Sequence, residues 1–331
     1  MLLIDSLYIN NSGGKILLNY LIEELQKTDI EVFYLFDLRC IGDYQEIPEE
    51  RKVYMKGSLM TRYRFYKNNK NKFSKVFCFA NTPPPIKLKC KVFVYFHNVS
   101  LIYQPQNYGF KERFLKKIKM YFIRVINNKN YTYIVQTNFV AQKLKKVIRN
   151  EVLILPFFKL STPSKEGFIK KKDHFVYISN GNTHKNHEIL LSAWGKLGEK
   201  SLFPTLHLTI TSNYTDLIGK IECLKTQGVK IENHGYCDPI FLYEISKFSI
   251  YPSLTESFGL GIIEAINYEC EIICSDLQYA YEVCSPKDVF NPFDIDSIVN
   301  AVERAMFSKI NEYETKPVIS NKINELLNIL K

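Results

Sequence analysis

Two glutamates flank a short glycine-containing segment in a pattern suited to binding a phosphorylated sugar. Glu256 follows an apolar run that ends at Tyr251, and Glu264 lies about one turn inside a predicted helix. The start of that helix, Phe258-Gly259-Leu260-Gly261, can present backbone N–H groups to a phosphate. The carboxylates would repel the phosphate itself but can accept hydrogen bonds from sugar hydroxyls. By spacing alone, an ordinary amphipathic helix with a glutamate at its N-terminus is the simpler interpretation.

A second glycine-containing turn, Asn10-Asn11-Ser12-Gly13-Gly14, lies between the first apolar run and a helix expected to begin near Lys15. Its glycines would let a ligand approach the backbone, and N–H groups at the helix start suit an anion. The turn is not a GxGxxG sequence, and no acidic residue about 20 positions on ends a second strand as in dinucleotide-binding domains. A tight turn without a ligand is the alternative.

Other patterns favour structural interpretations. Asp294 and Asp296 form a DxD pair but directly precede a helical pattern, so we expect helix capping. His184 and His187 have HxxH spacing, but zinc needs more ligands and no Cys or acidic cluster is adjacent. The nucleophile-elbow and P-loop sequences are absent, which argues against an α/β-hydrolase and a P-loop nucleotidase. We therefore expect no metal and no cofactor.

The elements that must position these residues alternate between strands and helices. Apolar runs of strand length occur at 2–8, 31–36, 75–80, 92–96, 132–136, 151–155, 174–179, 206–211, 229–233, 248–251, 271–275 and 288–290. Helical patterns occur at 15–27, 111–127, 138–148, 186–198, 215–227, 239–247, 260–268 and 294–307. The strands are apolar nearly throughout, which is typical of parallel strands buried on both faces. The alternation predicts an α/β fold with two doubly wound Rossmann-like domains that face each other across a cleft.

The length of 331 residues fits two domains of about 150–170 residues. A polar stretch after Pro156 separates them, so we expect one domain at 1–157 and a second at 158–331. The final stretch, about 317–331, reads as one more helix that could pack back on the N-terminal domain.

The composition is that of a globular protein, with 46% hydrophobic and 24% charged residues. The sequence shows no signal peptide and no transmembrane run. Eight cysteines without a CxxC indicate a reduced cytosolic protein. Charge is uneven: residues 1–150 contain 26 Lys and Arg against 11 Asp and Glu, whereas 151–331 contain 18 against 23. We therefore expect the first half to meet something anionic.

The C-terminal half resembles the retaining glycosyltransferase family 4, the group 1 glycosyltransferases of GT-B type, and in particular its bacterial surface-polysaccharide members. The resemblance rests on ExFGLxxxEA at 256–265 after Pro252-Ser253, and on CEIICSDLQYAYEV, FNPFDIDSIVNA and HFVYISNGNTHKNHEIL. It is close over about 170–305. It is looser over the first half, where Gly13-Gly14, Phe96-His97-Asn98 and residues 134–137 occupy the places of the family's glycine turn, cleft histidine and second cleft strand.

The resemblance implies that 1–157 is the acceptor-side domain and that 158–331 is the nucleotide-sugar-binding domain. It also implies a role for each matching residue. Lys185 would bind the donor's phosphates, Glu264 the ribose hydroxyls, and Glu256 the transferred sugar. His97 would lie near the sugar, and Gly13-Gly14 would admit the donor diphosphate and the acceptor. The implied catalytic residues are thus His97, Lys185 and Glu256, and the implied donor-binding residues are Gly13, Gly14, Asn180, His184, Lys185, Ser257, Phe258, Gly259, Leu260, Gly261 and Glu264.

Three positions depart from the family pattern. Family members commonly have Arg five residues before the lysine, where this chain has Asn180, so one phosphate ligand is lost or is replaced by His184 or Asn186. Gly261 stands where Pro often follows the FGL sequence, and Ser257 where Gly commonly precedes the phenylalanine. The helix start is therefore expected to be less preorganised.

Two basic segments suggest a further partner. Residues 51–75 contain nine Lys and Arg and no acid, and residues 111–126 combine lysines with an apolar stripe of Phe114, Ile118, Phe122 and Val125. A basic amphipathic helix suits an anionic membrane surface. The alternative is a helix packed through this stripe on its own sheet. Nucleic acid is not expected, because no RNP-like or helix-turn-helix sequence is present.

We therefore expect a metal-independent, retaining glycosyltransferase. It would move a sugar from a nucleotide-sugar donor to a glycan or lipid-diphosphate-linked acceptor, in the cytoplasm or peripherally at the inner membrane face. A GT-B sugar-nucleotide epimerase and a non-catalytic nucleotide-sugar-binding module are the alternatives, and Asn180 and Gly261 leave room for the second.

Overall fold

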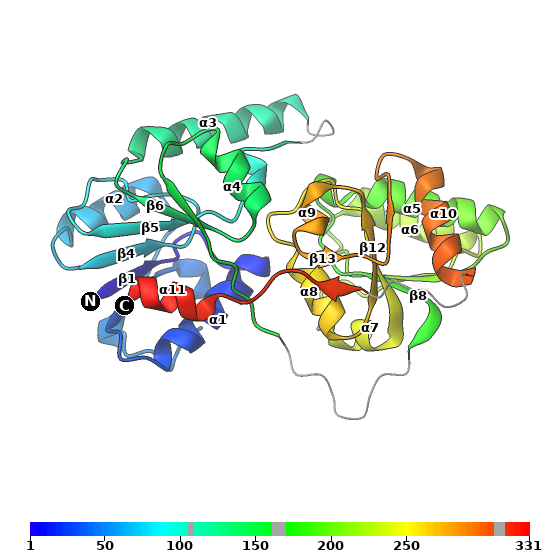
Figure 1. Ribbon diagram of the computed structural model, residues 1–331, viewed down its shortest axis with the longest axis horizontal. Helices are drawn as coiled ribbons and strands as arrows, with labels where there is room; N and C mark the ends of the chain where they lie inside the picture. The colour runs from blue at the N-terminus through cyan, green and yellow to red at the C-terminus, as the bar shows by residue number, and fades with distance from the viewer. Residues whose placement is uncertain (105–108, 161–169, 308–314) are drawn as a thin grey trace. The chain divides into compact units, whose positions relative to one another are not determined.

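The computed structural model describes residues 1–104, 109–160, 170–307 and 315–331 (Figure 1). These residues form two compact units. The N-terminal unit comprises 1–104, 109–159 and 320–331, and the C-terminal unit lies within 160–319. Both are α/β units with a parallel sheet, as the alternation of apolar runs and helical patterns predicted.

The N-terminal unit contains a seven-stranded sheet in the order β3-β2-β1-β4-β5-β6-β7. All six strand pairs are parallel. The strands are β1 (Leu2–Asp5), β2 (Val32–Asp37), β3 (Lys52–Met55), β4 (Lys75–Cys78), β5 (Lys91–Tyr95), β6 (Thr132–Val135) and β7 (Glu151–Ile154). The helices are α1 (Ser12–Gln26), α2 (Leu59–Asn68), α3 (Phe110–Ile126) and α4 (Asn138–Lys145), with short 3-10 turns η1 (Leu38–Cys40), η2 (Glu49–Arg51) and η3 (Val99–Leu101).

The C-terminal unit contains a six-stranded parallel sheet in the order β10-β9-β8-β11-β12-β14. Its strands are β8 (Lys171–Tyr177), β9 (Thr205–Leu208), β10 (Ile231–Asn233), β11 (Ser246–Tyr251), β12 (Glu271–Ser275) and β14 (Asp288–Phe290). The helices are α5 (His187–Glu199), α6 (Thr215–Thr226), α7 (Ile240–Ile245), α8 (Leu260–Asn267), α9 (Gln278–Tyr281) and α10 (Ile295–Phe307), with the 3-10 turn η4 (Thr183–Lys185).

The C-terminal stretch is not one helix over 317–331. Residues 316–317 form β15, which pairs antiparallel with β13 (Cys284–Ser285), and only α11 (Ile323–Leu330) is helical. Asn321 donates to the carbonyl of Phe158, and Lys75 donates to the carbonyl of Ile329. The end of the chain is therefore part of the N-terminal unit, and α11 lies beside α1 in Figure 1.

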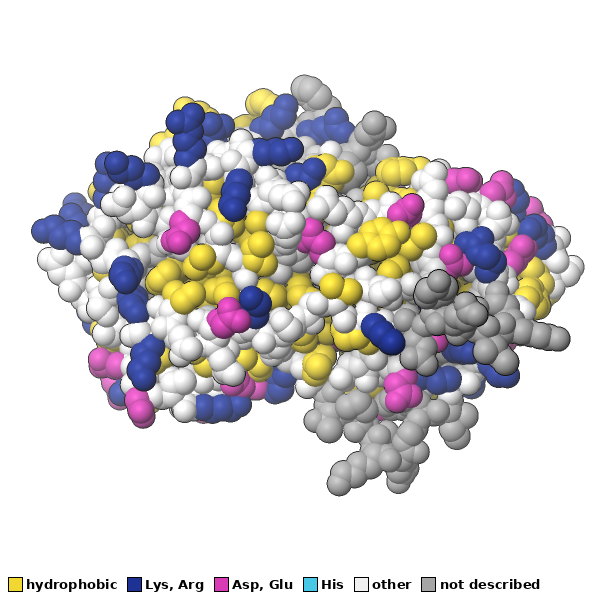
Figure 2. Space-filling model, viewed as in Figure 1, with side chains coloured by type: hydrophobic (Ala, Val, Ile, Leu, Met, Phe, Trp, Pro, Cys, Tyr) yellow, Lys and Arg dark blue, Asp and Glu magenta, His cyan; other side chains and the backbone are white. Residues whose placement is uncertain are grey.

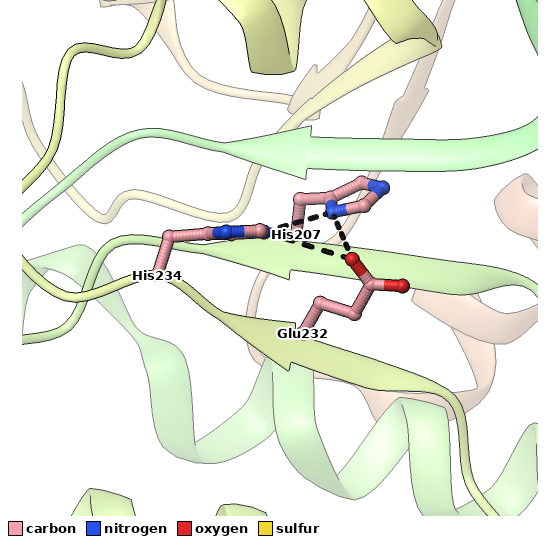
Figure 3. A group of neighbouring side chains, drawn as sticks. All are labelled: His207, Glu232 and His234. Carbon is pink, nitrogen blue, oxygen red and sulfur yellow. Dashed lines mark hydrogen bonds and ion pairs between the residues drawn. The ribbon is translucent and has the colours of Figure 1, made fainter.

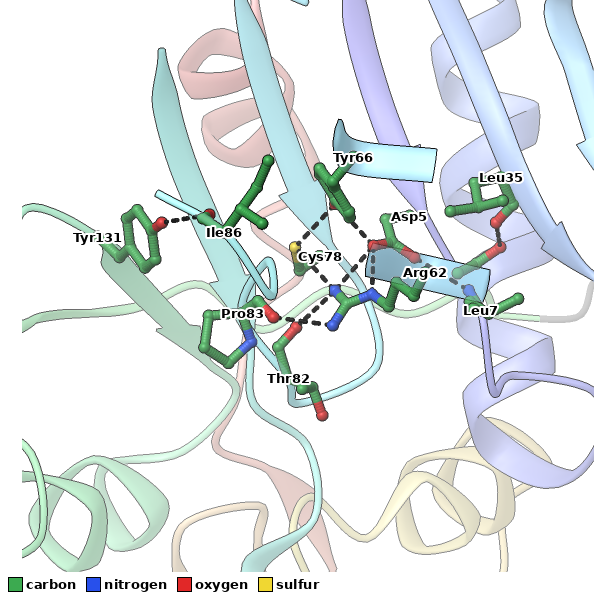
Figure 4. A network of polar contacts seen from close by, with 11 residues as sticks. Asp5, Leu7, Leu35, Arg62, Tyr66, Cys78, Thr82, Pro83, Ile86 and Tyr131 are labelled. Atoms are coloured by element: carbon green, nitrogen blue, oxygen red, sulfur yellow. Dashed lines mark hydrogen bonds and ion pairs between the residues drawn. The ribbon is translucent and has the colours of Figure 1, made fainter. Parts of the chain in front are cut away.

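A buried ion pair connects α2 to the centre of the N-terminal sheet (Figure 4). The Arg62 guanidinium contacts Asp5 at 2.7 Å and donates to the carbonyls of Thr82 and Pro83. Tyr66 donates a hydrogen bond to the same carboxylate at 2.7 Å. Both charged side chains are almost fully buried. Arg62 belongs to the basic segment 51–75, but its side chain is buried, so it is not available to an anionic partner of that segment.

Two other basic residues of 51–75 are also engaged within the N-terminal unit. Lys52 pairs with Glu49 and donates to the carbonyl of Tyr44, and Lys75 donates to α11. The positive charge that 51–75 presents to solvent is therefore smaller than its nine Lys and Arg suggest. The segment forms β3 and α2, which the sequence analysis did not predict.

The apolar stripe of α3 does not pack on its own sheet. Met120 and Ile123 are buried, but Phe114, Leu115, Ile118, Tyr121 and Val125 are 48–70% exposed. Phe122, which the helical period placed on the stripe, is half-buried. The packed-helix alternative is therefore wrong for this stripe. Among the described residues, no helix combines the length and apolar character needed to cross a membrane. All eight cysteines are free thiols.

Candidate active site

The carboxyl ends of two neighbouring strands in the C-terminal unit bring Lys185 and Glu256 together. β8 leads into η4, which ends at Lys185, and β11 leads into the loop that carries Glu256. Because adjacent parallel strands end at the same sheet edge, the two turns meet. Lys185 Nζ lies 2.7 Å from Glu256 Oε1, and the side chains are 19% and 13% exposed. This pairing joins residues 71 positions apart in the sequence.

The ion pair keeps both groups charged despite their burial. Burial by itself would lower the pKa of Lys185, but the neighbouring Glu256 carboxylate outweighs it, and the pKa lies above its ordinary value. Burial would raise the pKa of Glu256, but the Lys185 ammonium and nearby His184 hold that pKa below its ordinary value. A cation and an anion are therefore available side by side at neutral pH.

Four hydrogen bonds hold the two turns together. The Tyr177 hydroxyl lies 2.7 Å from Ser253 Oγ and donates to the carbonyl of Lys185 at 3.1 Å. Asn186, in the left-handed conformation at φ 61°, donates from its side chain to the carbonyl of Pro252. The backbone N–H of Leu254 donates to the carbonyl of His184 at 2.8 Å. These contacts limit the freedom of the Lys185–Glu256 pair.

The glycine-containing segment opens α8 as the sequence predicted. Gly259 has φ 86°, which favours glycine, and α8 begins at Leu260. The first N–H groups of a helix have no partner within the helix, so this end is suited to an anion. Phe258 is buried, whereas Ser257 is half-buried. A Cβ at Gly261 would lie 2.9 Å from the Tyr251 hydroxyl oxygen, which explains why this position has no side chain.

Glu264 lies inside α8 and has a different environment from Glu256. Its Oε2 accepts a long hydrogen bond of 3.5 Å from the Tyr243 hydroxyl. Burial raises its pKa, and the Tyr243 hydrogen bond offsets only part of that effect. The structure gives Glu264 no cationic partner among the residues it describes. Its carboxylate is thus poorly compensated and would gain from hydroxyl donors of a ligand.

The remaining residues of the predicted donor site in this unit have local structural contacts. The exposed Asn180 side chain accepts the backbone N–H of Asn182, and its carbonyl lies 3.0 Å from His187 Nε2. His184 belongs to η4 and His187 begins α5, so the two histidines do not share a helix face. Burial lowers the pKa of His187 to about 4. Asp294 caps α10 by accepting the backbone N–H of Asp296, whereas the Asp296 side chain pairs with Lys196.

A second group of predicted residues lies in the N-terminal unit. Ser12 to Gly14 begin α1, and a Cβ at Gly14 would lie 3.8 Å from His97 Nε2. Gly13 is exposed, with open space beside it. His97 follows β5. The structure therefore brings Gly14 and His97 together, although 83 positions separate them in the sequence.

Asn81 fixes the orientation of His97 and was missed by sequence reasoning. Its Oδ1 accepts the backbone N–H groups of His97 and Asn98, at 2.8 and 2.9 Å. Its Nδ2 lies 3.3 Å from His97 Nε2, which assigns the lone pair to Nε2 and the proton to Nδ1. Nδ1 is buried and makes no hydrogen bond within the described part of the chain. Burial lowers the pKa of His97 to about 4, so the ring is neutral at pH 7.

Two other contributors carried little sequence signal. Tyr177 and Ser253 are buried polar residues within apolar runs, where nothing in the pattern distinguishes a hydroxyl that holds a loop from one that fills the core. Only the Pro252-Ser253 sequence before the loop suggested that this turn is specialised.

Residues 159–320 match the family model described as "Glycosyl transferases group 1". A 70-residue segment is 36% identical to the serotype-specific mannosyltransferase WbdA of Escherichia coli; the match spans 21% of this chain and 9% of that protein. The chain thus spans less than a tenth of this curated relative.

Solved structures share the fold across both units. WaaG, described as a glycosyltransferase involved in lipopolysaccharide biosynthesis, aligns over 100% of both chains with a TM-score of 0.70 and 14% identity. The sucrose-phosphate synthase of Thermosynechococcus elongatus aligns over 93% of this chain and 90% of its own, with a TM-score of 0.70 and 14% identity. Anabaena HepE, solved with UDP and glucose, covers 93% of this chain and 90% of its own, with a TM-score of 0.64 and 12% identity.

Proposed function

Because its C-terminal unit belongs to the group 1 glycosyltransferases and both units share the GT-B fold, we propose that this protein is a retaining, metal-independent glycosyltransferase. It would transfer a sugar from a nucleotide-sugar donor to the hydroxyl of a glycan or lipid-diphosphate-linked acceptor. The observation that carries the proposal is the Lys185–Glu256 pair beside the glycine-opened start of α8, within the segment that matches the family. UDP bound to the fold neighbour HepE supports a nucleotide-sugar donor.

The chemistry requires that negative charge growing on the leaving diphosphate be stabilised. Lys185 would supply a full positive charge, and the N–H groups at the start of α8 would supply dipoles. Donor binding would draw Lys185 from Glu256 toward phosphate, which releases the Glu256 carboxylate to accept sugar hydroxyls. Glu264 would accept hydrogen bonds from the ribose. This division places the phosphates against positive groups and the hydroxyls against carboxylates.

In the N-terminal unit, His97 would contribute as a neutral donor. Its Nδ1–H is buried and has no hydrogen-bond partner among the residues that the structure describes, and burial lowers its pKa to about 4, so the ring is neutral at pH 7. A sugar hydroxyl oxygen could therefore accept the Nδ1 proton in a hydrogen bond. Gly14 would leave room beside the ring, since any larger side chain would approach Nε2.

A thermal-shift panel of UDP-, GDP- and other nucleotide sugars is the first experiment, because a donor that binds the folded state raises the Tm. Donors that bind are then incubated with and without lipid-diphosphate-linked glycans. Transfer with the donor's anomeric configuration kept, at a rate unaffected by Mg²⁺ or Mn²⁺, is the expected result. Epimerised sugar without an acceptor would instead indicate the epimerase, and inversion at the anomeric carbon would contradict the retaining mechanism.

We further propose that α3 places the protein on an anionic membrane surface, at the inner membrane face. Lys and Arg gather over α2 and α3 in Figure 2, and α3 combines Lys and Arg with five exposed apolar side chains. Apolar side chains that enter the headgroup region while lysines meet anionic lipids are typical of interfacial helices. Each Lys or Arg near such a surface contributes about 1 kcal/mol.

Vesicle co-sedimentation tests the membrane proposal. The wild type is expected to bind vesicles that contain phosphatidylglycerol and to release them as salt is raised. Y121E, which puts a charge on the exposed stripe, should weaken binding at least tenfold. F203E, on an exposed phenylalanine of the C-terminal unit, is the matched control and should bind as the wild type. Equal binding by all three proteins would contradict a role for α3.

A further inference from the structure

Three histidines and one glutamate lie together on one face of the C-terminal sheet. His174 is on β8, His207 on β9 and Glu232 on β10, and His234 follows β10 directly. His207 is paired with Glu232 in the sheet register, and His174 is paired with Thr205, two residues before His207. Because side chains alternate between the faces of a sheet, all four point to the same side.

Three ligand-type atoms of this cluster face one another (Figure 3). His207 Nδ1 lies 3.1 Å from His234 Nε2 and 3.3 Å from Glu232 Oε2, and His234 Nε2 lies 3.8 Å from the same carboxylate oxygen. Zinc binds imidazole nitrogen and carboxylate oxygen at about 2.0–2.2 Å, so two ligands of a tetrahedral ion lie about 3.3–3.5 Å apart. The three atoms thus already form a triangle close to one face of such a tetrahedron.

The hydrogen bonds around the cluster leave these atoms short of protons. His207 Nε2 lies 2.7 Å from His174 Nδ1. If His207 Nε2–H donates to His174, then His207 Nδ1 holds a lone pair. This lone pair faces His234 Nε2 and Glu232 Oε2. The only proton among these three atoms would then be on His234 Nε2, and it would have to be shared in hydrogen bonds to both His207 Nδ1 and Glu232 Oε2. A cation can instead satisfy all three lone pairs at once.

The environment suits a metal that enters from solvent. The His207 side chain is 1% exposed, whereas those of His234 and Glu232 are 23% and 57% exposed. The inner ligand is thus fixed by the sheet, and the outer two are accessible.

We propose that His207 Nδ1, His234 Nε2 and Glu232 Oε2 form a binding site for one divalent transition-metal ion of the zinc class, with a fourth position open to water. Two imidazoles and a carboxylate are a ligand set that zinc accepts. His174 acts as a positioning residue, because its Nδ1 accepts a hydrogen bond from the Nε2–H of His207 and so directs the Nδ1 lone pair of His207 toward the ion. The bound ion would fasten the short strand β10 to β9. None of these residues belongs to the proposed donor site.

The test is an isothermal titration of the metal-free, untagged protein with ZnCl₂. The wild type is expected to bind one zinc ion per chain, and its Tm should rise with zinc. E232Q and H234A change the exposed ligands and should lower the affinity about 100-fold or more. H174A should lower it by about 10–100-fold, as is typical of residues that orient a metal ligand.

Two control variants guard against adventitious binding. Glu222 is an exposed glutamate on α6 that pairs with Lys225, and Cys223 is an exposed thiol. E222Q and C223S should both bind zinc as the wild type does. The proposal is overturned if the wild type takes up no zinc, if E232Q and H234A bind as tightly as the wild type, or if C223S removes the binding.

Discussion

Replacing Lys185 with alanine should reduce both the stability and the turnover of the protein, for different reasons. In the unliganded protein the change leaves the Glu256 carboxylate, 13% exposed, without its cation at 2.7 Å. In the proposed reaction it removes the one full positive charge assigned to the leaving diphosphate. The two effects can be separated, because only the first depends on Glu256 being charged.

The structure sets the size of each effect. Removing one partner of a fully buried ion pair destabilises a protein by about 3–5 kcal/mol. Because both side chains retain some exposure, solvent should reduce this to about 2 kcal/mol, which corresponds to a fall of about 4–8 °C in Tm for a unit of this size. Loss of one donor to a developing oxyanion lowers the turnover rate by about 100–1000-fold, or about 2.7–4 kcal/mol.

The stabilising effect of the pair also has a defined pH range. The pKa of Glu256 is lowered from 4.5, so its contribution is present above pH 4.5 and is lost as pH falls through the folded-state pKa. The pKa of Lys185 is raised from 10.5, so its contribution is present below pH 10.5 and is lost as pH rises through the folded-state pKa. The Tm difference between wild type and K185A should therefore be largest between these values.

The assay compares K185A, E256Q and the double variant K185A/E256Q by thermal unfolding and by initial transfer rate. The double variant contains no unpaired charge at this site, so it should regain most of the lost Tm while its turnover stays as low as that of K185A. Wild-type turnover by K185A would refute the role of Lys185. Recovery of turnover together with stability in the double variant would show that the lysine acts only through folding.

Three further changes test other parts of the structure. E264Q should raise the Tm at pH 7, because burial raises the pKa of Glu264 and its ionised form opposes folding. This gain in Tm should vanish below pH 4.5, where the carboxyl is protonated in both the folded and the unfolded protein. Nucleotide affinity should fall about fivefold in E264Q, since a hydrogen bond to a charged acceptor is worth about 1 kcal/mol more than one to a neutral acceptor. G261A places a Cβ 2.9 Å from the Tyr251 hydroxyl oxygen and should destabilise the protein by about 1–3 kcal/mol in chemical unfolding. G219A is the control: no atom lies within 4 Å of a Cβ at this position in α6, so the alanine should stabilise the protein through its higher helix propensity. R62M leaves the Asp5 carboxylate buried without its cation and should destabilise the protein by about 3–5 kcal/mol. An unchanged unfolding midpoint would contradict a stabilising role for the Arg62–Asp5 pair.

Apolar patterning predicted most of the fold. Buried parallel strands require nearly continuous apolar runs, and the twelve predicted runs correspond to strands of the two sheets. The same criterion missed β3 and α2, because β3 is a half-buried edge strand and α2 is mostly polar. It also extended the last helix too far, since β15 forms by pairing with β13, Cys284 with Pro317 and Ser285 with Lys316, and a local pattern does not show such a distant partner.

By itself, the sequence determined the alternation of elements, the glycine-opened start of α8 and the residues expected to contact a donor. Tertiary structure alone decided which side chains meet: Lys185 with Glu256, Arg62 with Asp5, and His207 with its neighbours on β10. It also decided that the α3 stripe faces solvent. The physical reason is that a local pattern reports which residues prefer burial, whereas contacts between distant residues depend on strand order and register, which only the packing of the whole unit sets.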